Sequence, residues 1–241
     1  MSGETGFTTA SSALIEDLFV ANRILSDHKL VDGFGHVSAR HDRDPGRYVM
    51  TRNLAAGLVT PDDIVEFDLD SRPIRDIGVG YSVERFIHGE IYRSRPDVMA
   101  VVHSHAAPLI LFSVIKAPLR PLYHVASFLE DGAPIFDIRD AAGMTDLLIR
   151  TPELGRSLAQ MLADKSVVLM RGHGATIVGA SIKHAVFKAV YTMQNAELQR
   201  DAMCFGEVTY LAPEEAALST AFHAKAFERP WEFWKQQAFG Q

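Results

Sequence analysis

The chain has 241 residues, of which 47% are hydrophobic, so it is long enough to bury one sizeable core. We therefore expect a single domain over residues 1–241. The formal net charge of -6 and the isoelectric point near 5.9 argue against a nucleic-acid partner, because proteins that follow a phosphate backbone carry a basic excess. The one cysteine, Cys204, excludes an intramolecular disulfide and a thiolate metal cage, and we expect it to be a buried thiol.

We expect no targeting signal at the start of the chain. The first dozen residues, which include Glu4, lack the basic segment and the apolar stretch of a secretory signal. No later apolar run reaches the roughly 20 residues that a membrane span needs. We expect a cytoplasmic protein without a membrane partner.

The first part of the chain predicts a helix followed by short strands. Residues 11–29 place leucines at helical spacing, and a serine at the start can cap the helix. A glycine-containing turn at 31–36 leads into β-like runs at 37–40, 48–51 and 64–69. These runs predict an antiparallel meander.

The middle of the chain predicts a helix, a buried strand and another helix. Residues 82–95 have a helical pattern that Pro96 ends. The short apolar run at 99–102 predicts a buried strand, and Pro108 suits the first turn of the helix after it.

The last third predicts a second strand-to-helix unit. It consists of a buried strand at 167–170, a turn and a long helix at about 181–203, followed by a helix from near Pro213 and an aromatic tail at 231–234. Strands and helices mix here without strict alternation. This mixture favours an α/β sandwich whose central sheet is mainly antiparallel.

Two histidines at the end of a predicted strand, His103 and His105, have a spacing that suits metal binding. Side chains alternate across a strand, so the two imidazoles point to the same face. The pair alone is weak evidence, but a third histidine, His173, lies between two glycines after another buried strand. Three neutral imidazoles leave an open coordination position, as catalysis requires, and suit zinc, manganese, cobalt or iron without choosing among them.

Glu84 lies at the start of the helix that leads into the histidine strand. Its carboxylate could ligate the metal or move protons if the helix packs back over the sheet. The alternative is an acid that only favours the helix N-terminus through the helix dipole. The spacing leaves both interpretations open.

Together these residues resemble the class II aldolase/adducin family over nearly the whole chain. The resemblance begins at Gly35-His36-Val37-Ser38-Ala39-Arg40, and its best marker is Glu84 followed nineteen residues later by His103-Ser104-His105, with Arg-Gly-His173-Gly downstream. It implies that the three histidines bind one divalent metal per subunit, with manganese or zinc preferred over cobalt or iron. It also implies that Glu84 is the catalytic acid/base and a further metal ligand.

The resemblance implies a fold and an assembly as well. The fold is a three-layer α/β/α sandwich with a mainly antiparallel central sheet. The assembly is a homotetramer or a larger homo-oligomer with active sites at subunit interfaces. Aldolases of the family take a proton donor from a neighbouring subunit, a tyrosine, and the corresponding region here offers His124 or, as the alternative, Tyr123. His124 is therefore the second candidate catalytic residue.

The departures from the family concern substrate binding. Phosphate-binding aldolases carry Gly-Asn, Thr-Gly and Ser-Ser where this chain has Gly35-His36, Thr51-Arg52 and Ser82-Val83. With His36 and Arg52 in place of asparagine and glycine, a phosphate can no longer approach the backbone closely. Arg52 also adds a cation that can hold a carboxylate through two hydrogen bonds. We therefore expect Gly35, His36, Arg52 and Ser82 to bind a small-molecule carboxylate; the alternative for Arg52 is a solvated loop cation.

These changes make the chain resemble the branch of the family that decarboxylates hydroxylated aromatic or pyridine dicarboxylates. The Phe-Gly-His-Val-Ser turn at 34–38 fits that branch best. The resemblance implies a metal-dependent lyase in which Glu84 or His124 returns a proton to the ring, while Arg52 and His36 hold the second carboxylate. Two alternatives stay open: an aldolase or epimerase on a non-phosphorylated or sugar-acid substrate, and an adducin-like binding module without catalysis.

The remaining histidines carry no motif. His28, His41, His184 and His223 are expected to be surface or core residues. His88 lies four residues after Glu84 on the same helix face, where we expect a structural hydrogen bond.

Overall fold

A seven-stranded sheet forms the centre of the computed structural model, which describes residues 9–240. Its strands are β1 (His36–Arg40), β2 (Arg47–Thr51), β3 (Ile64–Asp68), β4 (Ala100–Ser104), β5 (Ile135–Phe136), β6 (Val167–Met170) and β7 (Gly174–Gly179). The order across the sheet is β3-β2-β1-β4-β7-β6-β5. Neighbouring strands are antiparallel except β5 and β6, which are parallel. The expected α/β class with a mainly antiparallel sheet is confirmed.

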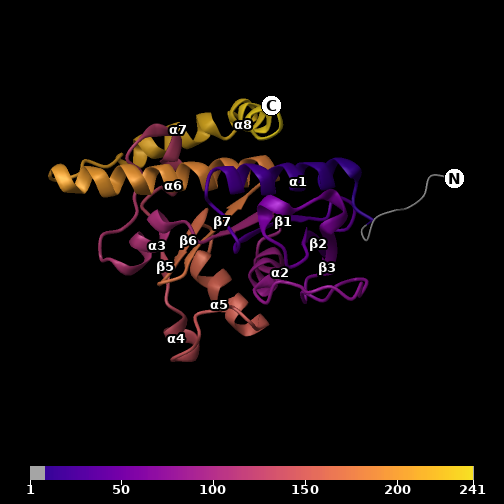
Figure 1. Ribbon diagram of the computed structural model, residues 1–241. Coiled ribbons are helices and arrows are strands. Elements are labelled where there is room, and N and C mark those ends of the chain that lie inside the picture. The colour runs from indigo at the N-terminus through magenta and orange to yellow at the C-terminus, as the bar shows by residue number, and fades with distance from the viewer. Residues whose placement is uncertain (1–8, 241) are drawn as a thin grey trace.

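Helices cover both faces of this sheet (Figure 1). One face carries α1 (Ser12–Asp27), α3 (Ala107–Val114) and α6 (Ile182–Phe205), and the other carries α2 (Arg85–Ser94), α4 (Ile138–Ala142) and α5 (Pro152–Leu162). Outside the first layer, α7 (Pro213–His223) packs on the 3-10 helix η3 (His124–Leu129), and α8 (Glu228–Phe239) packs on α1 and α6. Two further 3-10 helices are η1 (Ala56–Leu58) and η2 (Pro61–Asp63). The result is the expected three-layer sandwich.

The sheet separates two apolar cores. Side chains alternate across β4, so Ala100 and Val102 enter the core under α1, α3 and α6, whereas Val101 enters the core under α2 and α5. All three side chains are fully buried. Because both faces of β4 are buried, its end is held firmly from two sides, and this is where the histidine pair lies.

The predicted strand at 167–170 and helix at about 181–203 are confirmed as β6 and α6, but the sequence did not predict the strand between them. After β6 the chain turns back and forms β7, which pairs with both β6 and β4. Gly174 permits this pairing, because a Cβ atom at that position would clash with the Ser104 carbonyl oxygen. The β6–β7 hairpin therefore places its turn, which contains His173, beside the end of β4.

Two expectations for the last part of the chain also need correction. The aromatic tail is not a separate segment but part of α8, with Trp231 and Trp234 buried and Phe233 exposed. Cys204 is exposed rather than buried, because the last turns of α6 extend past the sheet, as Figure 1 shows. The elements β5, α4 and α5 were not predicted. Among residues 9–240, no helix is both long enough and apolar enough to cross a membrane.

Candidate metal centre

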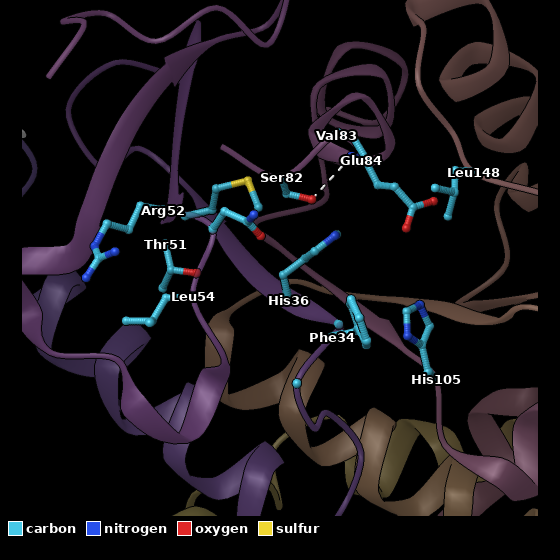
Figure 2. A pocket seen from close by; sticks show the side chains of 14 residues that line it. Phe34, His36, Thr51, Arg52, Leu54, Ser82, Val83, Glu84, His105 and Leu148 are labelled. Carbon is cyan, nitrogen blue, oxygen red and sulfur yellow. Dashed lines mark hydrogen bonds between the residues drawn. The ribbon is translucent and has the colours of Figure 1, made fainter. Parts of the chain in front are cut away.

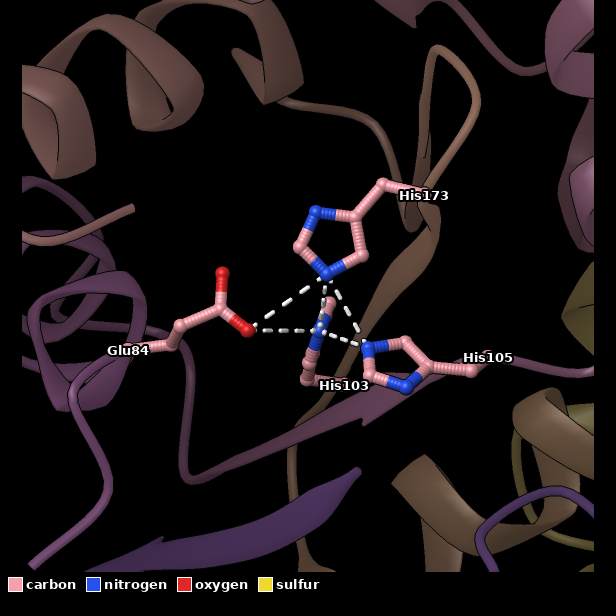
Figure 3. A group of neighbouring side chains, drawn as sticks. All are labelled: Glu84, His103, His105 and His173. Carbon is pink, nitrogen blue, oxygen red and sulfur yellow. Dashed lines mark hydrogen bonds and ion pairs between the residues drawn. The ribbon is translucent and has the colours of Figure 1, made fainter. Parts of the chain in front are cut away.

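Four side chains from three separate parts of the chain meet at the end of β4 (Figure 3). His103 lies in β4, His105 follows that strand by one residue, and His173 lies in the β6–β7 turn. Glu84 lies immediately before the first residue of α2, and its side chain makes no capping hydrogen bond to that helix. One ligand atom from each of the four residues lies within 4.8 Å of the others. The sheet thus brings together the four residues that the sequence suggested as metal ligands.

The three imidazoles face one another through the same atom. The Nε2 atoms of His103 and His105 are 2.9 Å apart, those of His105 and His173 are 3.0 Å apart, and those of His103 and His173 are 3.3 Å apart. Each Nε2 has one lone pair or one proton, so three such atoms cannot all satisfy each other by hydrogen bonds. A cation that accepts all three lone pairs resolves this arrangement, and a nitrogen-rich set with a carboxylate suits a divalent transition metal.

Hydrogen bonds to the backbone orient two of these side chains, His173 and Glu84, for metal binding. Nδ1 of His173 donates to the Leu147 carbonyl oxygen at 2.9 Å, so its Nε2 is left with the lone pair. Oε1 of Glu84 accepts the backbone N–H of Ile149 at 3.0 Å, and Oε2 lies 3.5 Å and 3.4 Å from Nε2 of His103 and His173. Contacts outside the centre therefore fix both the tautomer of His173 and the orientation of Glu84.

The charges of the centre also suit a cation. Burial opposes ionisation of Glu84, but the interactions with His103 and His173 are stronger and hold its pKa well below the usual range of a carboxyl group. Burial lowers the pKa of His105 to about 4, with the neighbouring histidines adding to the shift. At neutral pH the centre thus offers an ionised Glu84 and a neutral His105, which are the states that bind metal, whereas burial lowers but Glu84 more strongly raises the pKa of His173.

A pocket of about 230 Å³ opens beside this centre (Figure 2). Glu84 and His105 belong both to its wall and to the group of four. The other lining residues are Gly33, Phe34, Gly35, His36, Met50, Thr51, Arg52, Asn53, Leu54, Ser82, Val83 and Leu148. All four expected substrate-binding residues, Gly35, His36, Arg52 and Ser82, are therefore on the pocket wall.

Gly35 and Ser82 support two of the turns that form the pocket wall. Gly35 has a φ of +82°, and a Cβ atom there would lie 2.9 Å from Cγ1 of Val31 and 3.0 Å from the His103 carbonyl oxygen. Only glycine fits this turn against β4. Oγ of Ser82 accepts the backbone N–H of Glu84 at 3.2 Å, so it supports the turn that carries the carboxylate.

Arg52 lies on the pocket wall but is not the free cation that the sequence suggested. Its Nε donates to Oδ1 of Asp63 at 2.6 Å. Figure 2 shows its guanidinium group directed away from Glu84 and His105. Within residues 9–240 the two η nitrogens have no protein partner, so they remain free to bind a ligand at that end of the pocket.

His124 and Tyr123 lie outside this pocket. The His124 ring packs against His223 of α7 with centroids 5.2 Å apart, and the Tyr123 hydroxyl lies 3.5 Å from the Gln194 side-chain oxygen. Neither residue lines the pocket of its own chain. A catalytic role for His124 thus requires the neighbouring subunit that the resemblance implied.

The other histidines have contacts away from the four-residue centre. His41 binds Thr9, His28 packs on Trp234, and His184 stacks on Phe227. His88 makes the expected hydrogen bonds, to Ser38 and to His36. The sequence did not predict Phe34 and Leu148 as pocket residues, although a phenylalanine between two glycines is a signal that could have identified the first.

Comparisons with known proteins agree on the family. The profile of the Class II Aldolase and Adducin N-terminal domain matches residues 16–200. A protein named Decarboxylase tropJ from Talaromyces stipitatus is 34% identical over 238 residues, covering 89% of this chain and 90% of that protein. A 3,4-dihydroxyphthalate decarboxylase from Arthrobacter keyseri is 31% identical over 202 residues and covers 78% of each chain.

Solved structures share the fold. An aldolase II superfamily protein from Pseudomonas syringae has a TM-score of 0.80 at 21% identity, covering 96% of this chain and 94% of that one. An L-fuculose 1-phosphate aldolase from Glaciozyma antarctica has a TM-score of 0.77 at 21% identity, covering 94% and 88%. At this identity the likeness shows the fold alone. From the matched profile and the related sequences, we conclude that the chain belongs to the class II aldolase and adducin family.

Proposed function

We propose that this chain is a divalent-metal-dependent carbon–carbon lyase that removes a carboxylate from a hydroxylated aromatic or pyridine ring. The observation that carries the proposal is that Glu84 and His105 belong to the four-residue centre and also to the pocket wall. A substrate in the pocket therefore lies against the centre. The decarboxylase names of the relatives with 34% and 31% identity support the choice of reaction.

The walls of the pocket favour a flat ring. Phe34 is 73% exposed, and its ring centroid lies 6.3 Å from that of His105. Leu54, Val83 and Leu148 add apolar surface to the same pocket. An aromatic ring that slides between these side chains covers Phe34, which water otherwise surrounds.

Glu84 is the residue that we assign to proton transfer. A divalent cation bound by Glu84 and the three histidines would supply Lewis-acid stabilisation of the negative charge that develops as the carboxylate leaves. The ionised Glu84 takes the proton of the ring hydroxyl. When the carbon–carbon bond breaks, carbon dioxide leaves, the electron pair stays on the ring, and Glu84 gives its proton to the vacated ring carbon. The hydroxyl recovers a proton from water, and His124 of a neighbouring subunit is the alternative donor.

The reaction is tested with the metal-loaded protein and two groups of compounds. One group contains hydroxylated aromatic and pyridine dicarboxylates, including 3,4-dihydroxyphthalate, and the other contains non-phosphorylated aldols and sugar acids. We expect carbon dioxide and a product that has lost one carboxylate from the first group. Release of an aldehyde from the second group alone would replace the proposal by the aldolase alternative, and a protein that binds no metal would favour the adducin-like module.

Phe34→Ala should raise the KM for a hydroxylated aromatic carboxylate about tenfold, because an aromatic contact and its apolar area together contribute on the order of 1.4 kcal/mol. Phe34→Tyr keeps the ring and should stay within about threefold of the wild type. Steady-state kinetics of the two variants measure the difference. Equal KM values for Phe34→Ala and the wild type on every aromatic substrate would exclude ring stacking at this position.

Arg52→Lys should lower kcat/KM for a hydroxylated dicarboxylate by about ten- to a hundredfold, because a lysine cannot offer two parallel N–H groups to the carboxylate that stays. The loss should be much smaller for a monocarboxylate analogue. Arg75→Lys, at an exposed position outside the pocket, is the matched control. If Arg52→Lys equals the wild type on every dicarboxylate, Arg52 serves only its ion pair with Asp63.

The assembly and the metal are also proposals. Exposed apolar side chains gather on the end of α6 and on α7, where Phe205 is 92%, Leu218 is 77% and Phe222 is 74% exposed. Such surface is typical of contacts between subunits, which supports a homotetramer or larger homo-oligomer with interface active sites. We propose manganese or zinc as the metal and the cytoplasm as the location.

A further inference from the structure

A chain of four polar side chains runs inward from the pocket wall. Nδ1 of His36 lies 2.7 Å from Nε2 of His88, Nδ1 of His88 lies 2.6 Å from Oγ of Ser38, and that oxygen lies 2.8 Å from the Tyr92 hydroxyl. His36 lines the pocket, whereas Ser38 and His88 are 0% and Tyr92 is 1% exposed. Each of these distances is that of a good hydrogen bond.

The Tyr92 hydroxyl determines which group donates in each of these hydrogen bonds. Burial raises the pKa of Tyr92, so its hydroxyl keeps the proton and has to donate it. Within residues 9–240, Oγ of Ser38 is the acceptor that the protein offers to this hydroxyl. If Ser38 donated to Tyr92 instead, a buried O–H group would have no acceptor, which is an unfavourable arrangement. Tyr92 therefore donates to Ser38.

The donor and acceptor of each remaining hydrogen bond, from Ser38 through His88 to His36, follow from this one. Ser38 accepts from Tyr92, so its own proton is free to go to Nδ1 of His88. Burial lowers the pKa of His88 to about 3, and a neutral imidazole carries one N–H, which must then be at Nε2. This N–H donates to Nδ1 of His36. Because Nδ1 of His36 accepts this N–H, the proton of the His36 ring is on Nε2.

Nε2 of His36 is the atom that remains for a ligand. Within residues 9–240, Nε2 of His36 has no hydrogen-bond partner. The fully buried side-chain atoms without a hydrogen-bond partner are Oδ1 of Asn22 and Nε of Arg120 and Arg171, so Nε2 of His36 is accessible from the pocket. Figure 2 shows the His36 ring between Phe34 and Ser82, directed toward the side where Glu84 lies. A donor at this position points into the same space as the four-residue centre.

We propose that Ser38 and His88 are positioning residues that hold His36 as a hydrogen-bond donor, so that its Nε2–H binds a negatively charged oxygen of the substrate, a carboxylate or a phenolate. A fixed donor favours an acceptor oxygen and disfavours a hydroxyl or ammonium group that has to donate in the same place. The substrate class rests on the proposed function, whereas the tautomer of His36 does not.

The tautomer is measured directly by two-bond proton–nitrogen NMR correlation on zinc-loaded protein with 15N-labelled histidine. The signals of His36 are identified by their loss in His36→Gln. We expect His36 in the Nε2–H form without any substrate. A His36 ring in the Nδ1–H form would overturn the proposal, even if the protein is a decarboxylase.

Two substitutions of His88 separate positioning from packing. His88→Gln can still accept from Ser38 and donate to His36, whereas His88→Met has a similar length without polar atoms. We expect both variants to keep the metal. His88→Gln should keep KM within about threefold, and His88→Met should raise it about tenfold with kcat little changed, as for one lost hydrogen bond to a charged group. Equal losses in the two variants would show that His88 only packs, and would contradict the proposal.

Ser38→Ala is the second variant if His88→Met fails to fold. It removes the partner of Nδ1 of His88 and leaves the rings in place. We expect the NMR spectrum of His36 to change from one tautomer to a mixture of two. A single unchanged Nε2–H tautomer in Ser38→Ala would show that Ser38 does not set the state of His36.

Discussion

Glu84→Gln should lower kcat on a hydroxylated aromatic carboxylate by roughly a hundred- to ten-thousand-fold, the range typical of a lost general acid/base. Glutamine has nearly the same size, and its amide oxygen can still accept the backbone N–H of Ile149, as Oε1 of Glu84 does. It cannot take the hydroxyl proton and deliver it to the ring carbon. The loss is therefore expected in turnover while the fold is retained, and steady-state kinetics with thermal unfolding measure both.

Metal content is the control for this experiment, because Oε2 of Glu84 also faces the histidines. Emission spectrometry on the same samples shows whether the variant still binds one ion per chain. Glu153→Gln, an exposed acid in the first turn of α5, is the matched variant and should leave kcat and metal content unchanged. A Glu84→Gln variant within about threefold of the wild-type kcat would exclude Glu84 as the proton carrier.

His103→Ala and His173→Ala should each lose stoichiometric divalent metal and all measurable turnover. The three Nε2 atoms lie 2.9 Å to 3.3 Å apart, so removing one imidazole leaves an incomplete donor set that water can enter. The same result is expected for His105→Ala. Emission spectrometry after dialysis against metal-free buffer measures the loss.

His184→Ala is the matched control for these variants, because His184 stacks on Phe227 and is not one of the four residues of the centre. It should retain the metal content of the wild type. Full metal occupancy in any of the three variants at the centre would remove that histidine from the proposed ligands. Normal turnover by a variant without metal would contradict the metal dependence itself.

The candidate metal-binding histidines could be predicted from the sequence because the signals are local. The apolar run before His103 identifies a buried strand, and Pro108 identifies the helix after it, so the pair had to lie at a strand end. The glycines around His173 likewise indicated a tight turn. Glu84 needed more than spacing, since the family resemblance rather than the helix pattern favoured a catalytic role.

Other features depend on pairing between distant residues, which a single sequence does not reveal. β7 begins and ends with glycine, and in the sequence Gly174 indicates a turn before a helix rather than a strand. The pairing of β7 with β4, which brings His173 close to His103, joins residues about 70 positions apart in the sequence. The partners His36 and His88 are 52 residues apart in sequence, and nothing local indicates their contact.

The ion pair of Arg52 is likewise a contact that the sequence does not reveal, although its partner is close in the sequence. Its sequence context suggested a cation facing the substrate, but its Nε is paired with Asp63, eleven residues later, at the end of the 3-10 helix η2. The sequence does not indicate this ion pair, because the position of Asp63 depends on the pairing of β2 with β3. The helix α5 was missed despite a capping threonine, Thr151, and a proline at its first position.

Metal-dependent decarboxylation is tested most directly by the carbon dioxide that the protein releases from a 13C-carboxyl-labelled hydroxylated aromatic dicarboxylate such as 3,4-dihydroxyphthalate. The metal-loaded protein should release one labelled carbon dioxide for each substrate consumed. Release should stop when a chelator removes the ion and return when manganese or zinc is added back. Substrate consumption without carbon dioxide, or undiminished release from protein shown to contain no metal, would contradict the proposed function.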